Sequence, residues 1–263
     1  HINLKEFNKS IKNNNIKIIK IKPTNTNTII TKVNTFNFIN NNWKKNYSQN
    51  KIKFIKTMLP LIAYQNQKII LERKKLLDIK NFLESKNTLS NIDIKYLYKI
   101  SKKYKLKSNN VHKIDLINSL LKRVEIIPNS IVLAQAANES GWGTSRFARE
   151  YNALFGQYTY DEKNGIIPFD RQEGQNHLIK NFSSIDKSVE SYFNNINTHY
   201  AYEEFRNIRY LSKSNNEDFN IEELTKTLKV YAADILYVDT INSIIKTNNL
   251  KKFDLEFNLF IKS

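Results

Sequence analysis

Cysteine is absent from the sequence, which excludes disulfide bonds and thiolate metal sites. Long apolar runs are absent too, since no stretch approaches the roughly 18 consecutive apolar residues that a membrane-spanning helix needs. Before residue 20 the sequence does not show the pattern of a signal peptide, a charged segment followed by an apolar one. The chain starts at His1 rather than Met. We therefore expect a trimmed fragment or a mature form, from which an export signal or an anchor could have been removed.

Acidic residues are few in this chain of 263 residues: 25 Asp and Glu stand against 42 Lys and Arg, a formal charge of +17. Lys, Asn and Ile are all abundant, which is the compositional bias that an AT-rich genome produces in any protein surface. The alternative is a surface that attracts a nucleic acid, a membrane or an anionic polymer of the cell wall. Because the basic residues are dispersed and no zinc-finger or RNP-like motif accompanies them, we predict no nucleic-acid partner.

Glycine and proline are also rare, with five and four residues, and long segments of the chain have helical spacing. With 40% hydrophobic and 12% aromatic residues, the chain can bury a core. We predict a mainly α protein of the α+β class. Its predicted parts are an irregular arm over residues 1–42, a helical region over 43–126, a second domain over 127–252 and a C-terminal tail over 253–263.

All five glycines lie between Gly141 and Gly174, so turns and close backbone approaches are concentrated in one window. Short strands over residues 157–160, 166–169 and 177–182 predict a small β-hairpin lobe, whose turns take Gly165 and Gly174. Gly141 and Gly143 lie outside that hairpin and follow a helix. This placement is typical of a loop that carries a functional site on a helical scaffold.

Glu139 occupies the last turn of the helix that precedes Gly141. The body of this helix is apolar nearly all round, which predicts burial, and Gly141 is predicted to end it in the left-handed conformation. The negative end of the helix dipole, burial and the neighbouring Trp142 all favour the protonated form of Glu139, which predicts a raised pKa and a proton-donating role. The alternative, which the residues alone leave open, is a salt bridge from Glu139 to Arg146 or Arg149.

Two motifs carry a family resemblance. Residues 133–145, with the sequence LAQAANESGWGTS, and residues 152–157, with the sequence NALFGQ, resemble the bacterial β-N-acetylglucosaminidases of glycoside hydrolase family 73. The likeness is strongest to the Bax-type proteins of that group. It covers residues 45–252, and shorter matching segments occur at residues 58–62, 71–73, 171–175, 182–184 and 194–199.

The resemblance implies a lysozyme-like fold, with an α lobe, a small β-hairpin lobe and a groove between them for the glycan. It implies cleavage of the β-1,4 bond after N-acetylglucosamine in peptidoglycan, with Glu139 as the proton donor to the leaving oxygen. A tyrosine that lines the family's site matches Tyr231, for which aromatic packing on a helix is the alternative. The alternative functions are a lytic transglycosylase on the same substrate and a non-catalytic scaffold that binds the cell wall.

Glycosidases usually pair two carboxyl groups, and here the second is open. We predict Glu173, because it stands in the segment that resembles the family's hairpin, with Asp170 as an alternative. A further alternative is attack by the N-acetyl group of the substrate itself.

Sugar rings need flat apolar platforms and hydrogen-bonding edges, which predicts further groove residues. These are Trp142, Phe155, Tyr158, Gln135, Asn138 and Gln157, with a core position as an equal alternative for Phe155. His177 and His199 lack the spacing of a metal pair, so neither a metal nor a cofactor is predicted. We expect a monomer that binds the glycan strands of peptidoglycan after export to the periplasm or the cell surface.

Overall fold

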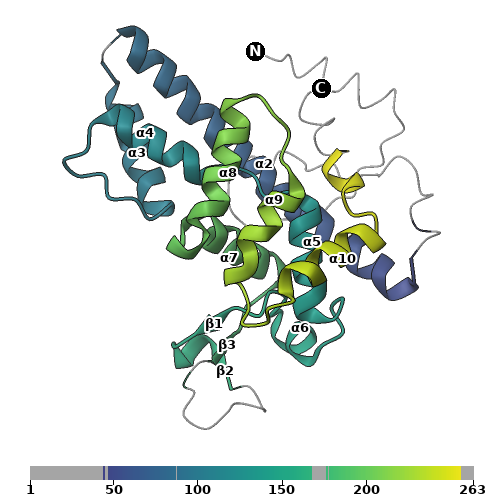
Figure 1. Ribbon diagram of the computed structural model, residues 1–263. Helices are drawn as coiled ribbons and strands as arrows, with labels where there is room; N and C mark the ends of the chain where they lie inside the picture. The colour runs from purple at the N-terminus through teal and green to yellow at the C-terminus, as the bar shows by residue number, and fades with distance from the viewer. Residues whose placement is uncertain (1–43, 45–46, 87, 168–175, 177, 256–263) are drawn as a thin grey trace, which may run out of the picture. The chain divides into compact units, whose positions relative to one another are not determined.

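The computed structural model describes residues 44, 47–86, 88–167, 176 and 178–255 (Figure 1). The chain divides at Pro60 into two compact units, and helix α2 (Gln49–Lys86) crosses this boundary. In the first unit the described residues belong mainly to the start of α2. The predicted irregular arm, residues 1–42, lies outside the described residues.

In its described residues, the second unit, from Leu61 onward, is mainly helical and carries one small sheet, which confirms the predicted fold class. None of the helices in the described ranges is long and apolar enough to cross a membrane. After α2 the elements are α3 (Asn91–Lys103), α4 (Lys113–Arg123), α5 (Asn129–Ser140), α6 (Arg146–Tyr151), β1 (Tyr158–Thr159), η2 (Glu162–Asn164), β2 (Gly165–Ile166), β3 (Leu178–Lys180), α7 (Ile185–Thr198), η3 (Tyr200–Tyr202), α8 (Glu203–Ser214), α9 (Ile221–Lys226), η4 (Thr227–Val230) and α10 (Tyr237–Thr247).

The three strands form an antiparallel sheet in the order β1-β3-β2. Tyr158 pairs with Ile179, and Gly165 pairs with Lys180. A Cβ added at Gly165 would lie 2.5 Å from Leu178 Cδ1, so only glycine allows β2 to approach β3 this closely. Gly165 therefore serves as a strand residue at a close approach to β3, and not as the turn residue that was predicted.

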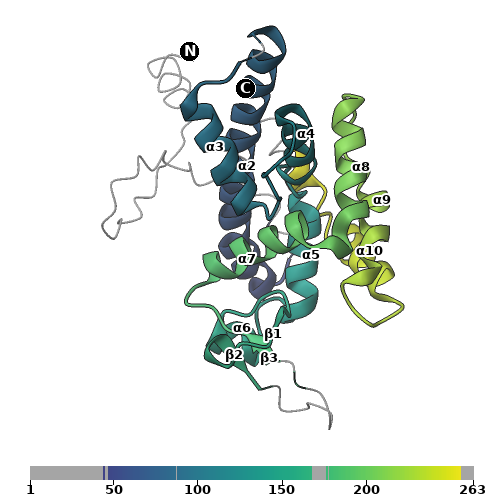
Figure 2. The ribbon, with the colours of Figure 1, turned by 90° about the vertical axis from the view of Figure 1, so that its left-hand side faces the viewer.

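The strands are two or three residues long, shorter than predicted. Asp161 explains why β1 is short. Its side chain accepts a hydrogen bond from the Lys163 N–H at 3.0 Å and turns the chain into η2 directly after the strand. Residues 168–175, which include Gly174, lie outside the described residues. Figure 2 shows the sheet beside α6, the helix that follows α5.

Helix α5 is the buried helix of this unit. Its residues from Asn129 to Ala137 are all buried, as its apolar sequence predicts. Helix α10 packs along it, and Figures 1 and 2 show the two side by side. The two helices run antiparallel. Tyr237 at the start of α10 bonds to Gln135 late in α5. The chain after α10 returns to the start of α5, where Asn129 Nδ2 donates to the Phe253 carbonyl oxygen at 3.0 Å.

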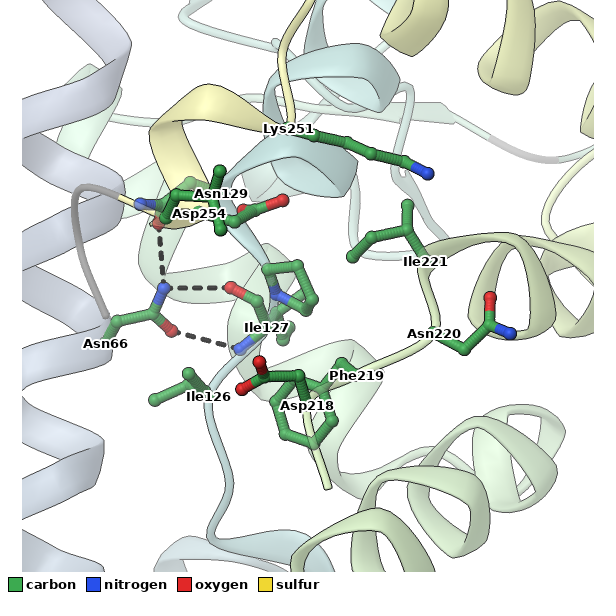
Figure 3. A pocket seen from close by; sticks show the side chains of 12 residues that line it. Asn66, Ile126, Ile127, Asn129, Asp218, Phe219, Asn220, Ile221, Lys251 and Asp254 are labelled. Carbon is green, nitrogen blue, oxygen red and sulfur yellow. Dashed lines mark hydrogen bonds between the residues drawn. The ribbon is translucent and has the colours of Figure 1, made fainter. Parts of the chain in front are cut away.

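Buried amides hold the first turn of α5 (Figure 3). Asn66 of α2 donates from Nδ2 to the Ile127 carbonyl oxygen at 2.8 Å and to Asn129 Oδ1 at 3.0 Å. Its Oδ1 accepts from the Ile127 N–H at 3.0 Å. Asp254 Oδ1 accepts from the Ser130 N–H at 2.9 Å. These bonds satisfy polar groups that the helix start would otherwise leave unpaired, and they fix where the helix begins.

Asp254 makes the stability of this unit depend on pH. Burial raises the pKa of Asp254 to about 6, although hydrogen bonds from Ser130 and from the Asn129 backbone oppose the shift. An Asp carboxyl in an unfolded chain titrates near about pH 4. Between these two values the folded state binds more protons than the unfolded state. The contribution to stability is therefore fully present below about pH 4 and is lost as the pH rises through about 6.

We expect the unfolding free energy of the wild type to fall by roughly 2 to 3 kcal/mol more than that of Asp254→Asn between pH 4 and pH 7, because asparagine does not titrate. Urea unfolding at both pH values measures this difference. Asp239→Asn, at an exposed position of α10, is the matched control. Parallel pH dependence of the wild type and Asp254→Asn would contradict a raised pKa at Asp254.

Candidate active site

The turn after α5 positions the first part of the site. Gly141 ends the helix with φ 55° and ψ 48°, in the left-handed region as predicted, and the Trp142 N–H donates to the Ala137 carbonyl oxygen at 2.9 Å. Trp142 and Gly143 also have positive φ, 58° and 77°. Ser140 Oγ accepts from the Gly143 N–H at 2.8 Å. Positive φ is strained for a bulky side chain, and such strain concentrates at functional sites.

Gly156 brings the second motif of the sequence onto the carboxylate of Glu139. Its φ is +57°, and a Cβ added there would lie only 2.7 Å from Glu139 Oε2. The backbone at the end of the NALFGQ segment therefore lies directly against the last turn of α5. The two motifs are separate in the sequence but meet at one candidate site. The first supplies the carboxyl group of Glu139, and the second supplies the backbone wall beside it at Gly156.

Replacing Gly156 with alanine is expected to displace the carboxylate of Glu139. Gly141→Ala is the matched control, because Gly141 has φ +55° and its added Cβ would meet Thr144 Oγ1 at 3.2 Å, not the carboxylate. Both variants should lose on the order of 1 kcal/mol or more of stability through the strained φ. Only Gly156→Ala should add a further loss of activity of about tenfold or more. Equal activity losses at equal stability, measured by enzyme assay and thermal melting, would contradict this arrangement.

A chain of hydrogen bonds leads from the core to Glu139. Tyr192 Oη donates to Gln135 Oε1 at 2.5 Å, and Gln135 Nε2 donates to Tyr237 Oη at 2.8 Å. The Tyr237 hydroxyl is hydrogen-bonded in turn to the Glu139 carboxylate. The Tyr237 oxygen accepts from Gln135, and the proton of the hydroxyl is the one available to the Glu139 carboxylate, whose pKa this bond lowers. Asn138 Nδ2 adds a longer bond to Glu139 Oε1, at 3.4 Å.

The environment of Glu139 favours its protonated form. Burial raises the pKa of Glu139, and the hydrogen bonds from Asn138 and Tyr237 lower it by less, so the pKa stays above its ordinary value. Among the described residues, Glu139 takes part in no ion pair. Arg146 instead lies 3.7 Å from Glu150, and Arg149 is exposed. The salt-bridge alternative is therefore not found, and the carboxyl is suited to donate a proton.

Tyr231, the predicted catalytic tyrosine, bonds to the wall of the site. Its Oη donates to the Phe155 carbonyl oxygen at 2.7 Å, and its ring stacks on Tyr237 with centroids 5.6 Å apart and planes 8° apart. It thus braces two neighbours of Glu139, Tyr237 and the backbone before Gly156. Its catalytic role stays a prediction.

Tyr237 is a residue of the candidate site that sequence reasoning did not predict. It stands at the first position of α10 and is buried, with 3% of its surface exposed. The start of a helix near residue 236 is visible in the sequence, but the contact with Gln135 joins residues 102 positions apart. No local pattern indicates such a contact.

Two predicted groove residues lie in the core. Gln135 is fully buried, and both ends of its amide are bonded to tyrosines, so it has no surface with which to contact a sugar. Its prediction as a substrate-binding residue is corrected on this ground. Phe155 is 1% exposed and stacks on Tyr192 with centroids 4.2 Å apart, which matches the core alternative.

The other predicted groove residues keep some exposure. Trp142 and Asn138 are half-buried, and Tyr158 on β1 is 63% exposed. Gln157 is half-buried and donates from Nε2 to the Ser191 carbonyl oxygen at 3.5 Å. Substrate contact by these four side chains stays a prediction.

Both candidates for the second carboxylate, Glu173 and Asp170, lie outside the described residues, as does His177. His199 Nδ1 accepts a hydrogen bond from the Ala201 N–H at 3.3 Å. Within the described ranges, no cluster of His, Asp and Glu has the composition of a metal site.

Comparison with known proteins identifies relatives of this chain. The profile of a family described as mannosyl-glycoprotein endo-β-N-acetylglucosaminidase matches residues 114–250. Protein bax of Escherichia coli strain K12 is 38% identical over 186 residues, which cover 69% of this chain and 63% of that protein. The chain thus spans less than two thirds of this relative's length. The catalytic domain of the autolysin Auto from Listeria monocytogenes aligns over 64% of this chain and 90% of that domain, with 18% identity and a TM-score of 0.39, a likeness too low to support an inference.

Proposed function

Since the chain belongs to the glucosaminidase family, we propose that it is an endo-acting peptidoglycan hydrolase with Glu139 as its general acid. The observation that carries the proposal is a single carboxyl at the end of a buried helix, with a raised pKa and a tyrosine hydroxyl directed at it. The proposed bond is the β-1,4 linkage after N-acetylglucosamine. A substrate of this kind implies a location outside the cytoplasm.

The proposed chemistry begins with proton transfer from Glu139 to the glycosidic oxygen that leaves. The raised pKa keeps that proton in place until the bond breaks. Once the proton has gone, Glu139 is an anion in a partly buried position, and the hydrogen bonds from Tyr237 and Asn138 stabilise it. The residues around the acid thus support both of its protonation states.

The second participant in the reaction comes from one of three sources. Glu173 remains our first choice, with Asp170 and the N-acetyl group of the substrate as alternatives. A carboxylate separation of about 5 Å would accompany retention of configuration, and about 6.5 to 9.5 Å would accompany inversion. Proton NMR of the first product anomer distinguishes retention from inversion.

Digestion of purified sacculi tests the proposed activity. We expect new reducing ends of N-acetylglucosamine, read by mass spectrometry after borohydride reduction. Anhydromuramic products would instead identify a lytic transglycosylase. No release of soluble fragments by the wild type would leave the non-catalytic scaffold as the remaining candidate.

A further inference from the structure

A pocket lies beside the candidate active site. It is a pocket of about 650 Å³, within the usual range for ligand pockets, and it is lined by parts of α2, α7 and β3. Glu139 does not line it. The pocket adjoins the site through Gln157, the neighbour of Gly156, because the Lys180 N–H donates to the Gln157 carbonyl oxygen at 2.7 Å and the Gln157 side chain reaches Ser191.

Positive charge exceeds negative charge in the lining of this pocket. Lys68 and Lys187 share one carboxylate, that of Glu190, at 3.5 Å and 2.8 Å. Lys103 also lines the pocket and pairs with Glu72 at 2.5 Å. Two lysines therefore compete for a single counter-charge.

Lys180 is the remaining cation of the lining. Its Nζ donates to Ser191 Oγ at 3.1 Å and lies 5.2 Å from the centre of the Phe182 ring. In the described part of the chain it pairs with no carboxylate. Lys68, Lys180 and Lys187 thus surround the pocket with one carboxylate among them.

The protonation state of Glu190 does not remove this excess. Partial burial by itself would raise the pKa of Glu190, but the hydrogen bond from Lys187 and the charge of Lys68 lower it below its ordinary value. Glu190 is therefore ionised at neutral pH, and its negative charge is already included in the balance of charges given above. In the described part of the chain, an incoming anion would meet Lys68 and Lys187, which share this one carboxylate, and Lys180, which pairs with none.

The rest of the lining indicates the kind of anion. Amide side chains occur at Asn164, Asn181 and Asn194, and amides can both donate to and accept from a peptide backbone. The aromatic residues of the lining, Tyr104, Phe182 and Phe193, are buried, so they offer no exposed face on which a nucleic-acid base could stack. Carboxylates on a short peptide suit this combination better than a nucleic acid does.

We infer that this pocket binds a short peptide through its carboxylates, and that Lys68, Lys180 and Lys187 receive them. The inference rests on the proposed function for its source of peptide, which is the acidic peptide branch carried by peptidoglycan. Binding there would hold the polymer next to the acid without taking part in bond cleavage. The pocket is thus an accessory binding site, separate from the glycan groove.

Binding of a glycan-free peptide tests this inference without requiring catalysis. The probe is the tetrapeptide L-alanyl-γ-D-glutamyl-meso-diaminopimelyl-D-alanine, titrated calorimetrically into the wild-type chain at low salt. Neutralising Lys68, Lys180 and Lys187 to glutamine should weaken binding by about tenfold or more, since charge-assisted hydrogen bonds are lost from partly exposed positions. The same peptide with its carboxylates amidated should bind the wild type about as weakly.

The control neutralises Lys95 and Lys99, which are exposed on α3 and do not line the pocket. It should bind the peptide like the wild type. Replacing Lys180 and Lys187 with arginine keeps the charge and should keep binding within a few-fold, which separates loss of charge from loss of fold. Unchanged affinity in the triple glutamine variant, or equal affinity for the amidated peptide, would overturn the inference.

Two further comparisons separate the peptide assignment from other anions, and this inference from the proposed function. Tighter binding of poly(glycerol phosphate) or of a single-stranded oligonucleotide than of the peptide, lost in the same triple variant, would overturn the peptide assignment. Digestion of sacculi without peptide binding would overturn this inference alone. Peptide binding without digestion would overturn the proposed function and leave the pocket standing.

Discussion

Replacing Glu139 with glutamine is expected to lower the rate of sacculus digestion by about 10³-fold, within the range that a general acid contributes. Glutamine preserves the shape of the side chain and its contact with Gly156, but it has no proton to give to the leaving oxygen. The measurement is the release of reducing-end N-acetylglucosamine over time. Glu150→Gln, a surface substitution on α6, should digest like the wild type.

The stability of Glu139→Gln gives an independent check. Because burial raises the pKa of Glu139, the folded state disfavours the charged carboxylate above neutral pH. Neutral glutamine avoids that cost, so the variant should melt at the same temperature as the wild type or higher at pH 8. A folded Glu139→Gln protein that solubilises cell wall as fast as the wild type would refute the catalytic assignment and favour the scaffold.

Replacing Tyr237 with phenylalanine is expected to change both the rate and its pH dependence. The hydroxyl of Tyr237 stabilises the ionised form of Glu139, so its removal raises the pKa of that carboxyl further. The acid then stays protonated to higher pH, and the basic limb of the pH–rate profile shifts upward. The maximal rate should nevertheless fall by about tenfold or more, because the carboxylate formed by proton transfer loses a hydrogen bond and a fixed orientation.

Tyr231→Phe is the matched control for Tyr237→Phe. It removes the bond to the Phe155 carbonyl oxygen but keeps the ring that stacks on Tyr237. Its rate is expected to fall with little shift of the basic limb, since Tyr231 is not hydrogen-bonded to Glu139. If the basic limb of Tyr237→Phe superimposes on that of the wild type, Tyr237 does not bond to the proposed general acid.

Local features of the site were predictable because their causes are local. The apolar helix before Glu139 is buried, Gly141 ends it in the left-handed conformation, and the pKa of Glu139 is raised. Each follows from neighbouring residues in the chain: an all-round apolar pattern, a glycine after the last turn and a carboxyl at a buried helix end. The same reasoning failed for Gln135, because an amide on a buried helix satisfies its polar atoms with distant partners that no spacing indicates.

By itself the sequence determined a mainly α protein with a small hairpin, the family motif and the acid at its centre. Only the tertiary structure decided what surrounds that acid: Gly156 against its carboxylate, Tyr237 bonded to it, and Tyr231 bracing both. These contacts depend on the packing of α10 along α5, which joins Gln135 to a tyrosine 102 positions away. Helix formation and capping depend on near neighbours and are visible in sequence, whereas packing between distant helices depends on burying complementary surfaces and is visible only in three dimensions.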